Sequence, residues 1–491
     1  MSTSFGTNVL KLLTSKIITQ AISFITAPII ARIYLPEHFG IVQLFTSING
    51  VIVVISCLRY ELSIPLGKDK NEVMSSFMIS IISVFMVSLL SFALVLILKE
   101  NISLWLKSPD LKRFLWILPI TVFLGGLGYS VSNYASWLGR FGTVAMASFG
   151  STTASIFITI PLGLSFGASA KFLFIGQVAG MILNTLIIFC LLSPRFLSDI
   201  KTANLSFNIL WDIAKRYKKF PIYDIWTALF NSVSMQLPPI ILGIYFSNKV
   251  VGYYSLGNKF IGLPMILLGT SISQVFFPSA AKEYNETGKL MNIVNNTFKR
   301  LTQIGVFPFM VLGLFGDLLF GFVFGENWVE AGIYTQILSI YVLIRFISSP
   351  LSTIFSILKR QGTGLVLTLV QLVNRIVVLL IFAKLGSPRN CLLAYSLVSS
   401  TFYILVFYFV FRFSKASIGL GVKTFIKNFI LSALLLLPTL FLVKIIDSIY
   451  FLFMVLIFDS IMYLFILYRF DSEIRIITRS IAGNFLTKKH L

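Results

Sequence analysis

The sequence predicts an all-α polytopic membrane protein with about fourteen transmembrane helices. Of its 491 residues, 57% are hydrophobic and only 12% are charged, whereas soluble domains carry about 25% charged residues. The mean hydropathy is +0.90. Apolar runs of about 20 residues, the length that crosses the hydrocarbon core, recur along the chain. A short motif also occurs twice, which indicates an internal duplication.

The apolar runs define the expected spans and their connections. In chain order, we expect spans at residues 9–34, 40–58, 73–98, 112–134, 143–165, 170–192, 219–246, 251–279, 299–325, 331–358, 362–385, 390–413, 424–444 and 449–470. The connections after residues 165 and 358 are very short and predict tight hairpins. Twelve spans remain an alternative if the 112–134 segment or the last pair lies at the membrane interface.

The duplicated motif organises the predicted fold. Its copies are Pro28-Ile-Ile-Ala-Arg-Ile-Tyr34 and Pro239-Ile-Ile-Leu-Gly-Ile-Tyr245, and a one-residue gap then aligns Gly40 with Gly252. The first copy closes the first span and the second copy closes the seventh span. Each repeat therefore contains six spans, an even number, and both repeats enter the membrane in the same direction. We therefore expect two parallel six-helix lobes related by a pseudo-twofold axis along the membrane normal. The predicted domains are an N-lobe (1–195), a basic cytoplasmic linker (196–218), a C-lobe (219–413) and an appended pair of spans with a cytoplasmic tail (414–491).

The net charge of +22 is interpreted through the positive-inside rule. In a soluble protein this charge would suggest nucleic acid, but cytoplasmic loops of membrane proteins are rich in Lys and Arg. Most of the 40 basic residues fall in the even-numbered connections and the tail, which predicts that both termini are cytoplasmic. The linker ends in Lys215-Arg-Tyr-Lys-Lys219. It is interpreted as a topology-setting loop near anionic lipid, with a first capture point for an anionic substrate as the alternative.

Several classes of function are not expected. The first helix lacks a cleavage site and is predicted to be retained. The three cysteines and two histidines have no metal-ligand spacing. The sequence has no phosphate-binding loop and no extramembrane segment large enough for a catalytic domain. We therefore expect a transporter without a bound cofactor rather than an enzyme. It would be driven by a Na⁺ or H⁺ gradient or by the membrane potential, which favours an outward-moving anion by about 2.3 kcal/mol per charge per 100 mV.

Ionisable residues inside the spans are the strongest functional candidates, because each costs about 2.5–3.5 kcal/mol at the centre of a membrane helix. Helical spacing places three of them on polar stripes that would line a shared water-filled interior. These stripes are Lys16 with Gln20 in the first span, Asp224 with Asn231 and Ser234 in the seventh, and Lys259 with Thr270 in the eighth. Arg345 and Arg375 fall close to the middles of the tenth and eleventh spans. Plain pairing between helices is the alternative for the basic residues, and a local pair with Glu61 is the alternative for Arg59. The predicted cavity residues, which would contact a diphosphate or a sugar, are Lys16, Gln20, Arg59, Asp224, Asn231, Lys259, Arg345 and Arg375. This set leans positive and favours an anionic substrate, with phosphate the commonest anion that Lys and Arg bind.

Two segments carry a resemblance to a known family. Ile29-Ile-Ala-Arg-Ile-Tyr-Leu-Pro-Glu-His-Phe-Gly40, and Val251-Gly-Tyr-Tyr-Ser-Leu-Gly-Asn-Lys259 followed by Pro264 and Pro278, resemble the bacterial O-antigen and polysaccharide flippases. These belong to the multidrug/oligosaccharidyl-lipid/polysaccharide exporter superfamily, and the resemblance covers essentially the whole chain. It implies two six-helix lobes in a V around a central cavity. It also implies alternating-access transfer of undecaprenyl-diphosphate-linked oligosaccharide, of the O-antigen or capsule type, to the periplasmic leaflet of the bacterial inner membrane.

The resemblance also suggests roles for individual residues. Lys259 lies five residues before Pro264, which matches a basic residue of the related lipid II flippase, and would contact the diphosphate. Gln20 and Thr26 occupy the places of arginines in that relative, with Lys16 one turn away, which argues against lipid II as the substrate. The last two spans resemble the pair that forms a lipid-tail groove there. The implied partners are membrane lipid, a polysaccharide polymerase and a chain-length regulator, with no nucleic acid.

Three alternatives stay open beside this hypothesis. A cation-coupled multidrug exporter of the same superfamily would need buried carboxylates, and the first lobe offers only Glu61 near an edge. A lipid II flippase is the second. A membrane-embedded glycosyltransferase or polymerase is the third and would need a sizeable loop with carboxylates, whereas the longest loop here is short and basic.

Overall fold

The computed structural model describes the backbone of residues 2–446, 448–471 and 475, and the side chains of most of them from residue 17 onwards. The described residues form helices and connecting turns without a strand, as the sequence predicts. The first half of the chain contains α1 (Ser2–Ile33), α2 (Pro36–Val53), η1 (Tyr60–Leu66), α3 (Lys70–Trp105), α4 (Leu111–Leu115), α5 (Leu118–Trp137), α6 (Phe141–Phe166), α7 (Ala170–Thr202), α8 (Phe207–Arg216), η2 (Phe220–Asp224) and α9 (Ile225–Tyr245). The second half contains α10 (Asn248–Ile261), η3 (Met265–Gly269), α11 (Thr270–Thr287), α12 (Met291–Phe324), η4 (Glu326–Trp328), α13 (Val329–Leu351), α14 (Ile354–Ile357), α15 (Gln361–Leu385), α16 (Pro388–Ser414), α17 (Ile418–Ile445) and α18 (Ile449–Phe470).

The chain forms two compact units. Unit 1 contains residues 1–257, 323–331 and 365–395, and unit 2 contains residues 258–322, 332–364 and 396–491. The division into an N-lobe, linker, C-lobe and appended pair rests on the sequence repeat and stays a prediction.

Within the described part of the chain, ten helices are long and apolar enough to cross a membrane. This confirms a polytopic helical membrane protein. All fourteen predicted ranges are helical, but the count of fourteen spans is not confirmed. Helices α2 and α5 are not among the ten, and α2 carries polar side chains along its length. The predicted 251–279 span is divided into α10, the π-helical turn η3 and α11, because Pro264 cannot donate a backbone hydrogen bond.

The predicted hairpin of α6 and α7 is confirmed, since the two helices pack on each other. Helices α6 and α7 are joined by three residues, and Gly167 there has a φ of 83°, which glycine adopts without strain. Between α14 and α15 the chain turns at Lys359, whose φ of 55° is also positive. Both connections are as short as the sequence predicts.

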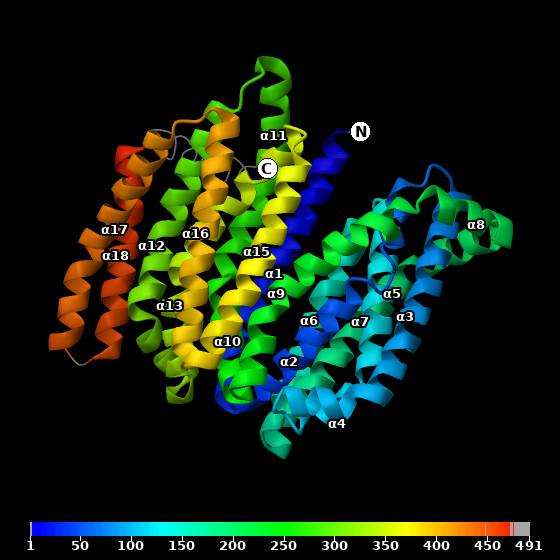
Figure 1. Ribbon diagram of the computed structural model, residues 1–491, viewed down its shortest axis with the longest axis horizontal. Coiled ribbons are helices and arrows are strands. Elements are labelled where there is room, and N and C mark those ends of the chain that lie inside the picture. The colour runs from blue at the N-terminus through cyan, green and yellow to red at the C-terminus, as the bar shows by residue number, and fades with distance from the viewer. Residues whose placement is uncertain (1, 447, 472–474, 476–491) are drawn as a thin grey trace, which may run out of the picture. The chain divides into compact units, whose positions relative to one another are not determined.

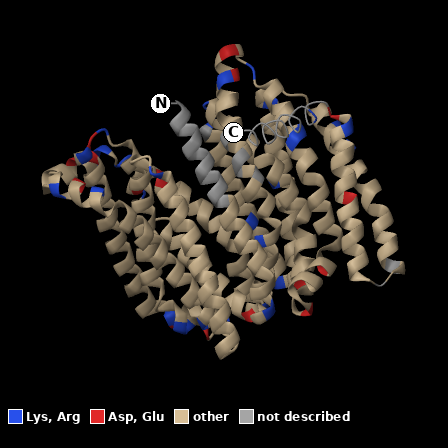
Figure 2. Ribbon diagram, turned by 180° about the vertical axis from the view of Figure 1, so that it is seen from behind, with Lys and Arg blue, Asp and Glu red and all other residues tan. Residues whose placement is uncertain are grey.

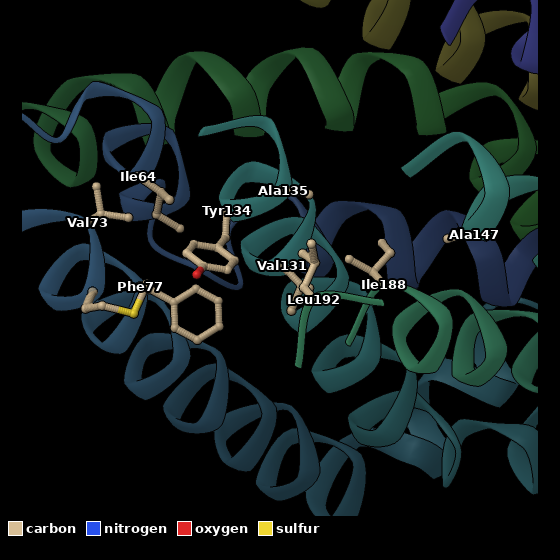
Figure 3. Close-up of a cluster of buried hydrophobic side chains, with 10 residues drawn as sticks. Ile64, Val73, Phe77, Val131, Tyr134, Ala135, Ala147, Ile188 and Leu192 are labelled. Atoms are coloured by element: carbon tan, nitrogen blue, oxygen red, sulfur yellow. The ribbon is translucent and has the colours of Figure 1, made fainter. Parts of the chain in front are cut away.

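The core of unit 1 lies where α3, α5 and α7 pack side by side (Figure 1). Its buried side chains include Val73 and Phe77 of α3, Tyr134 of α5 and Ile188 of α7. Figure 3 shows the rings of Phe77 and Tyr134 close together, with their centroids 6.0 Å apart in a tilted, edge-type contact. Such pairs stabilise a core by about 0.5–1.5 kcal/mol beyond their burial.

Unit 2 contains a second core, formed by α12, α17 and α18 (Figure 1). Phe307 of α12 stacks on Tyr463 of α18 at 4.7 Å between ring centroids. The Tyr463 hydroxyl donates to the Gln303 carbonyl at 2.7 Å. The Thr439 hydroxyl of α17 donates to the Asp459 carboxylate of α18 at 2.6 Å. These bonds satisfy polar groups that would otherwise be costly in an apolar interior.

Charged residues in each unit gather near helix ends, and few lie along the middles of the helices (Figure 2). This distribution is expected for helices that cross hydrocarbon. The exceptions are therefore the residues to consider for function.

Candidate functional site

The segments that follow the two copies of the repeated motif contact each other in unit 1. A Cβ atom built on Gly40 of α2 would lie 1.8 Å from the Asn248 carbonyl oxygen of α10, and one built on Gly252 would lie 1.8 Å from the Pro36 carbonyl oxygen. Pro36 precedes Gly40 by four residues, and Asn248 precedes Gly252 by four. The contact is therefore reciprocal, with a local twofold relationship between α2 and α10, as the sequence repeat leads one to expect.

Further contacts surround this crossing. The Trp328 indole Nε1 donates to the Ala31 carbonyl at 2.7 Å, and the Phe39 ring meets the Trp328 ring edge-on at 4.9 Å between centroids. The Ser255 hydroxyl donates to the Gln43 side-chain oxygen at 2.9 Å. The crossing is tightly packed and joined by several hydrogen bonds, which indicates a structural role for the motif.

Two of the predicted site residues, Arg59 and Asp224, form an ion pair at the other end of α2. Arg59 Nε donates to Asp224 Oδ2 at 2.7 Å, and Arg59 Nη1 lies 3.2 Å from Glu61 Oε1. The Glu61 side chain is only 5% exposed, against 21% for Arg59 and 40% for Asp224. Arg59 therefore balances a buried carboxylate and a partly exposed one. Both the expected local pair and a long-range pair are present.

The backbone is irregular at both partners of this ion pair. Leu58 and Arg59 have φ values of 48° and 65°, which residues with a Cβ adopt at a cost of about 1–3 kcal/mol. Asp224 is the last residue of the π-helical turn η2, and Pro221 lies in the first part of that turn. A π-helical turn inserts an extra residue and shifts the register of the following helix.

The polar stripe expected on α9 is only partly exposed. Asn231 is exposed, whereas Ser234 is buried and is bonded to Arg375 of α15. Arg375 Nη1 donates to the Ser234 hydroxyl at 2.9 Å and to its carbonyl at 3.2 Å. Its guanidinium also lies over the Tyr395 ring at 5.7 Å. Arg375 is 6% exposed and ties α15 to α9, the alternative that the sequence left open. Its assignment to substrate binding stays a prediction.

The first helix carries two more predicted residues. Gln20 is half-buried on α1. Lys16 lies in α1, but its side chain falls outside the described residues. Thr26 donates to the Ile22 carbonyl of its own helix at 2.8 Å. The part of the predicted stripe that includes Lys16 stays a prediction.

Lys259 and Arg345 belong to unit 2. Lys259 is exposed near the end of α10, about 17 Å along the helix from Asn248 at 1.5 Å per residue. That is about half of a 30 Å hydrocarbon core. Arg345 is half-buried on α13 and donates to the Tyr341 hydroxyl at 3.3 Å. The stripe expected to continue from Lys259 to Thr270 is broken by η3, and the Thr270 side chain lies outside the described residues.

An apolar cavity of about 690 Å³ lies among α12, α13, α16 and α17 of unit 2. Its walls include Phe298 of α12, Ile344 of α13, Ile404 of α16 and Phe425 of α17. It has no charged lining residue. A cavity of this composition accommodates hydrocarbon rather than a sugar or a phosphate.

Sequence reasoning missed a group of charged contacts that holds the 196–218 segment to α3. Glu72 accepts hydrogen bonds from Arg216 Nη1 at 3.0 Å and from the Tyr217 hydroxyl at 2.8 Å. Asp199, with a side chain 0% exposed, pairs with Lys70 at 3.0 Å and accepts from the Tyr134 hydroxyl at 2.7 Å. The partners are more than 60 residues apart in the chain, so local spacing carries no sign of them.

Comparison with known proteins identifies the family. The family model described as "Polysaccharide biosynthesis protein" matches residues 29–333, which is more than half of the chain. The protein belongs to this polysaccharide biosynthesis family. The matched region contains the first copy of the repeated motif from Ile29 onwards and the whole second copy. It also contains four of the predicted site residues, namely Arg59, Asp224, Asn231 and Lys259.

Proteins from several bacteria are similar to the chain. The succinoglycan biosynthesis transport protein ExoT of Rhizobium meliloti is 22% identical over 72% of this chain and 68% of its own length. The lipopolysaccharide biosynthesis protein WzxC of Escherichia coli is 24% identical over 43% of each chain. The match to the teichuronic acid biosynthesis protein TuaB of Bacillus subtilis is 24% identical and spans 28% of that protein's length.

Solved structures show that the family fold extends beyond these relatives. The lipid II flippase MurJ, in an inward closed conformation, matches with a TM-score of 0.71 and 16% identity over 93% of this chain and 98% of its own. An inward-facing multidrug transporter of the multidrug and toxic compound extrusion family matches with a TM-score of 0.65 and 14% identity over 82% of this chain. The superfamily fold expected from the sequence is confirmed.

Proposed function

We propose that this protein is a flippase that moves undecaprenyl-diphosphate-linked oligosaccharide repeat units, of the O-antigen or capsule type, from the cytoplasmic to the periplasmic leaflet. The bacterial inner membrane is its proposed location, with both termini in the cytoplasm. The membership in a polysaccharide biosynthesis family and the fold shared with a lipid II flippase support the substrate class. Catalysis has no part in the proposal, because moving a lipid-linked sugar across a bilayer makes and breaks no covalent bond.

Lys259 is the observation that carries the proposal. Its charge is exposed at about half the depth of the hydrocarbon core. An exposed ammonium at that depth faces either lipid or water, and lipid is penalised by about 2.5–3.5 kcal/mol. A water-filled space beside α10 is therefore favoured. A cation in such a space suits a diphosphate, which carries more than one negative charge within hydrogen-bonding reach of a side chain.

The apolar cavity of unit 2 suits the other part of such a substrate. A prenyl chain is hydrocarbon and gains about 25 cal/mol for each Å² that it removes from water. We propose that the walls formed by Phe298, Ile344, Ile404 and Phe425 contact part of this chain. The sugar units would stay in the aqueous space, where polar residues such as Gln20 and Asn231 can hydrogen-bond to hydroxyl groups. Driving force would come from the membrane potential or from a Na⁺ or H⁺ gradient.

Deleting the gene in its own host tests the proposal. We expect loss of a surface polysaccharide, together with accumulation of its lipid-linked precursor on the cytoplasmic side. Re-expression of the protein should restore both. Unchanged polysaccharide combined with altered drug sensitivity would refute the proposal and favour a multidrug exporter.

The multidrug alternative has one observation in its favour. Glu61 is buried, and its Oε2 atom accepts no hydrogen bond from the residues that the structure describes, so it could bind a coupling cation. The Arg59 guanidinium on its other oxygen competes with that role. If Glu61 coupled cations, Glu61→Gln would abolish transport driven by a gradient while leaving exchange of substrate across the membrane intact.

A further inference from the structure

A second groove in unit 2 combines a basic end with an apolar wall. It has a volume of about 670 Å³ and lies among α12, α17 and α18. Lys423 and Lys427 lie one helical turn apart on α17, and Lys299 of α12 lies near them in the lining. The apolar wall continues along α17 and α18 in the direction away from the lysines, and is formed by Ile430, Leu431, Leu434, Ile466 and Leu467.

The carboxylate in this groove, that of Asp471, is already paired with other side chains of the protein. Asp471, which is 7% exposed, lies 2.6 Å from Lys299 Nζ and 3.2 Å from Arg300 Nη1, and Gln303 Nε2 donates to it at 3.0 Å. Within the described part of the chain, Lys423 and Lys427 are exposed and form no ion pair. The groove therefore holds an excess of positive charge beside a built polar network.

We propose that this groove binds an anionic phospholipid, with its phosphate on Lys423 and Lys427 and one acyl chain along the apolar wall. The lysine and arginine distribution predicts that this end of α17 lies on the cytoplasmic side, where a lipid headgroup would lie at the depth of the lysines. Charge complementarity selects the anionic lipid, since each basic residue near an anionic surface strengthens binding severalfold. A zwitterionic lipid would bring an ammonium group to a site whose carboxylate already has two cations.

The bound lipid would hold α17 and α18 against α12. The three helices already share the Phe307–Tyr463 stack and the Thr439–Asp459 hydrogen bond. At the lysine end, Lys423 and Lys427 repel the nearby Lys299 and Arg300, and a phosphate between them would remove that repulsion. This inference does not depend on what the protein transports.

Native mass spectrometry of the full-length purified protein tests the proposal. The probes are phosphatidylglycerol and phosphatidylcholine with identical acyl chains. We expect phosphatidylglycerol to bind at least tenfold more tightly and to raise the melting temperature in detergent. The double variant K423Q/K427Q should lose about tenfold in phosphatidylglycerol affinity. The matched control K282Q/K289Q removes the same charge from exposed lysines near α11 and should bind as the unaltered protein does.

Three results would overturn the proposal. Equal binding of both phospholipids would show that charge does not select the lipid. Unchanged phosphatidylglycerol affinity in K423Q/K427Q, with a correctly folded protein by size-exclusion chromatography, would place the lipid elsewhere. Displacement of phosphatidylglycerol by equimolar undecaprenyl phosphate would make the groove part of the substrate path instead.

Discussion

Gly40 and Gly252 occupy equivalent positions after the two copies of the repeated motif, and each lies against the other's helix. Gly40 contacts the backbone at Asn248, four residues before Gly252, and Gly252 contacts the backbone at Pro36, four residues before Gly40. The carbonyl oxygens of Asn248 and Pro36 occupy the places where their Cβ atoms would stand. Helices can approach this closely only where a residue lacks a side chain. The repeat therefore records a physical requirement at the crossing of α2 and α10, and not ancestry alone.

Substituting either glycine should destabilise the crossing. A methyl group 1.8 Å from a carbonyl oxygen forces the two helices apart. Overpacking in a core costs about 1–3 kcal/mol of stability. We expect a loss near the upper end of this range for Gly40→Ala and Gly252→Ala, because the atom that each new methyl group meets belongs to the backbone and cannot rotate away. The melting temperature of purified protein measures this. Gly142→Ala is the matched control, because a Cβ there meets no atom within 4 Å and should change little.

Removing Arg59 should destabilise the protein more than removing Asp224. Arg59→Gln leaves the buried Glu61 carboxylate without a cation, which is costly. Asp224→Asn removes a carboxylate that is 40% exposed, so we expect a loss of at most about 1 kcal/mol. The double variant Arg59→Gln/Glu61→Gln should recover part of the loss. Equal melting temperatures for Arg59→Gln and Asp224→Asn would contradict this account of the cluster.

The sequence predicted most of the helical segments and the duplication, because hydrophobic length and a repeated motif are local signals. It did not predict the contacts of the polar residues. Helical spacing placed Asp224 and Ser234 on one stripe, but Asp224 pairs with Arg59 and Ser234 with Arg375. The Glu72 network was also invisible, since its partners lie far apart in the chain.

Lys259 and Arg345 should be needed for export. A hydrogen bond to a charged group contributes about 1.5–3 kcal/mol, so Lys259→Ala or Arg345→Ala should lower export roughly tenfold or more while protein levels stay normal. Lys259→Arg should keep most of the activity. Surface polysaccharide per cell is the measurement. Lys249→Ala is the control on the same helix and should export normally; full activity of both alanine variants would remove these residues from the site.

Arg375 should act mainly on stability. Its guanidinium donates two hydrogen bonds to Ser234 of α9. Arg375→Ala removes both hydrogen bonds and the cation–π contact with the Tyr395 ring. We expect a loss of about 2–4 kcal/mol, measured as a lower melting temperature and a lower yield of folded protein. A variant with normal stability and no export would instead support the substrate-binding role.

The contact between Glu72 and the linker should control access to its basic residues. Burial and the hydrogen bond to Glu72 raise the pKa of the Tyr217 phenol to about 12, so Tyr217 is a neutral donor at pH 7. Glu72→Gln weakens the bonds to Arg216 and Tyr217 by about 1–2 kcal/mol in total. Local opening of this segment then becomes more frequent. Trypsin, which cleaves after Lys and Arg, should cut the 215–219 segment several times faster. Glu286→Gln removes an exposed partner of Lys282 and should leave that rate unchanged, because the bonds from Glu72 to Arg216 and Tyr217 stay intact.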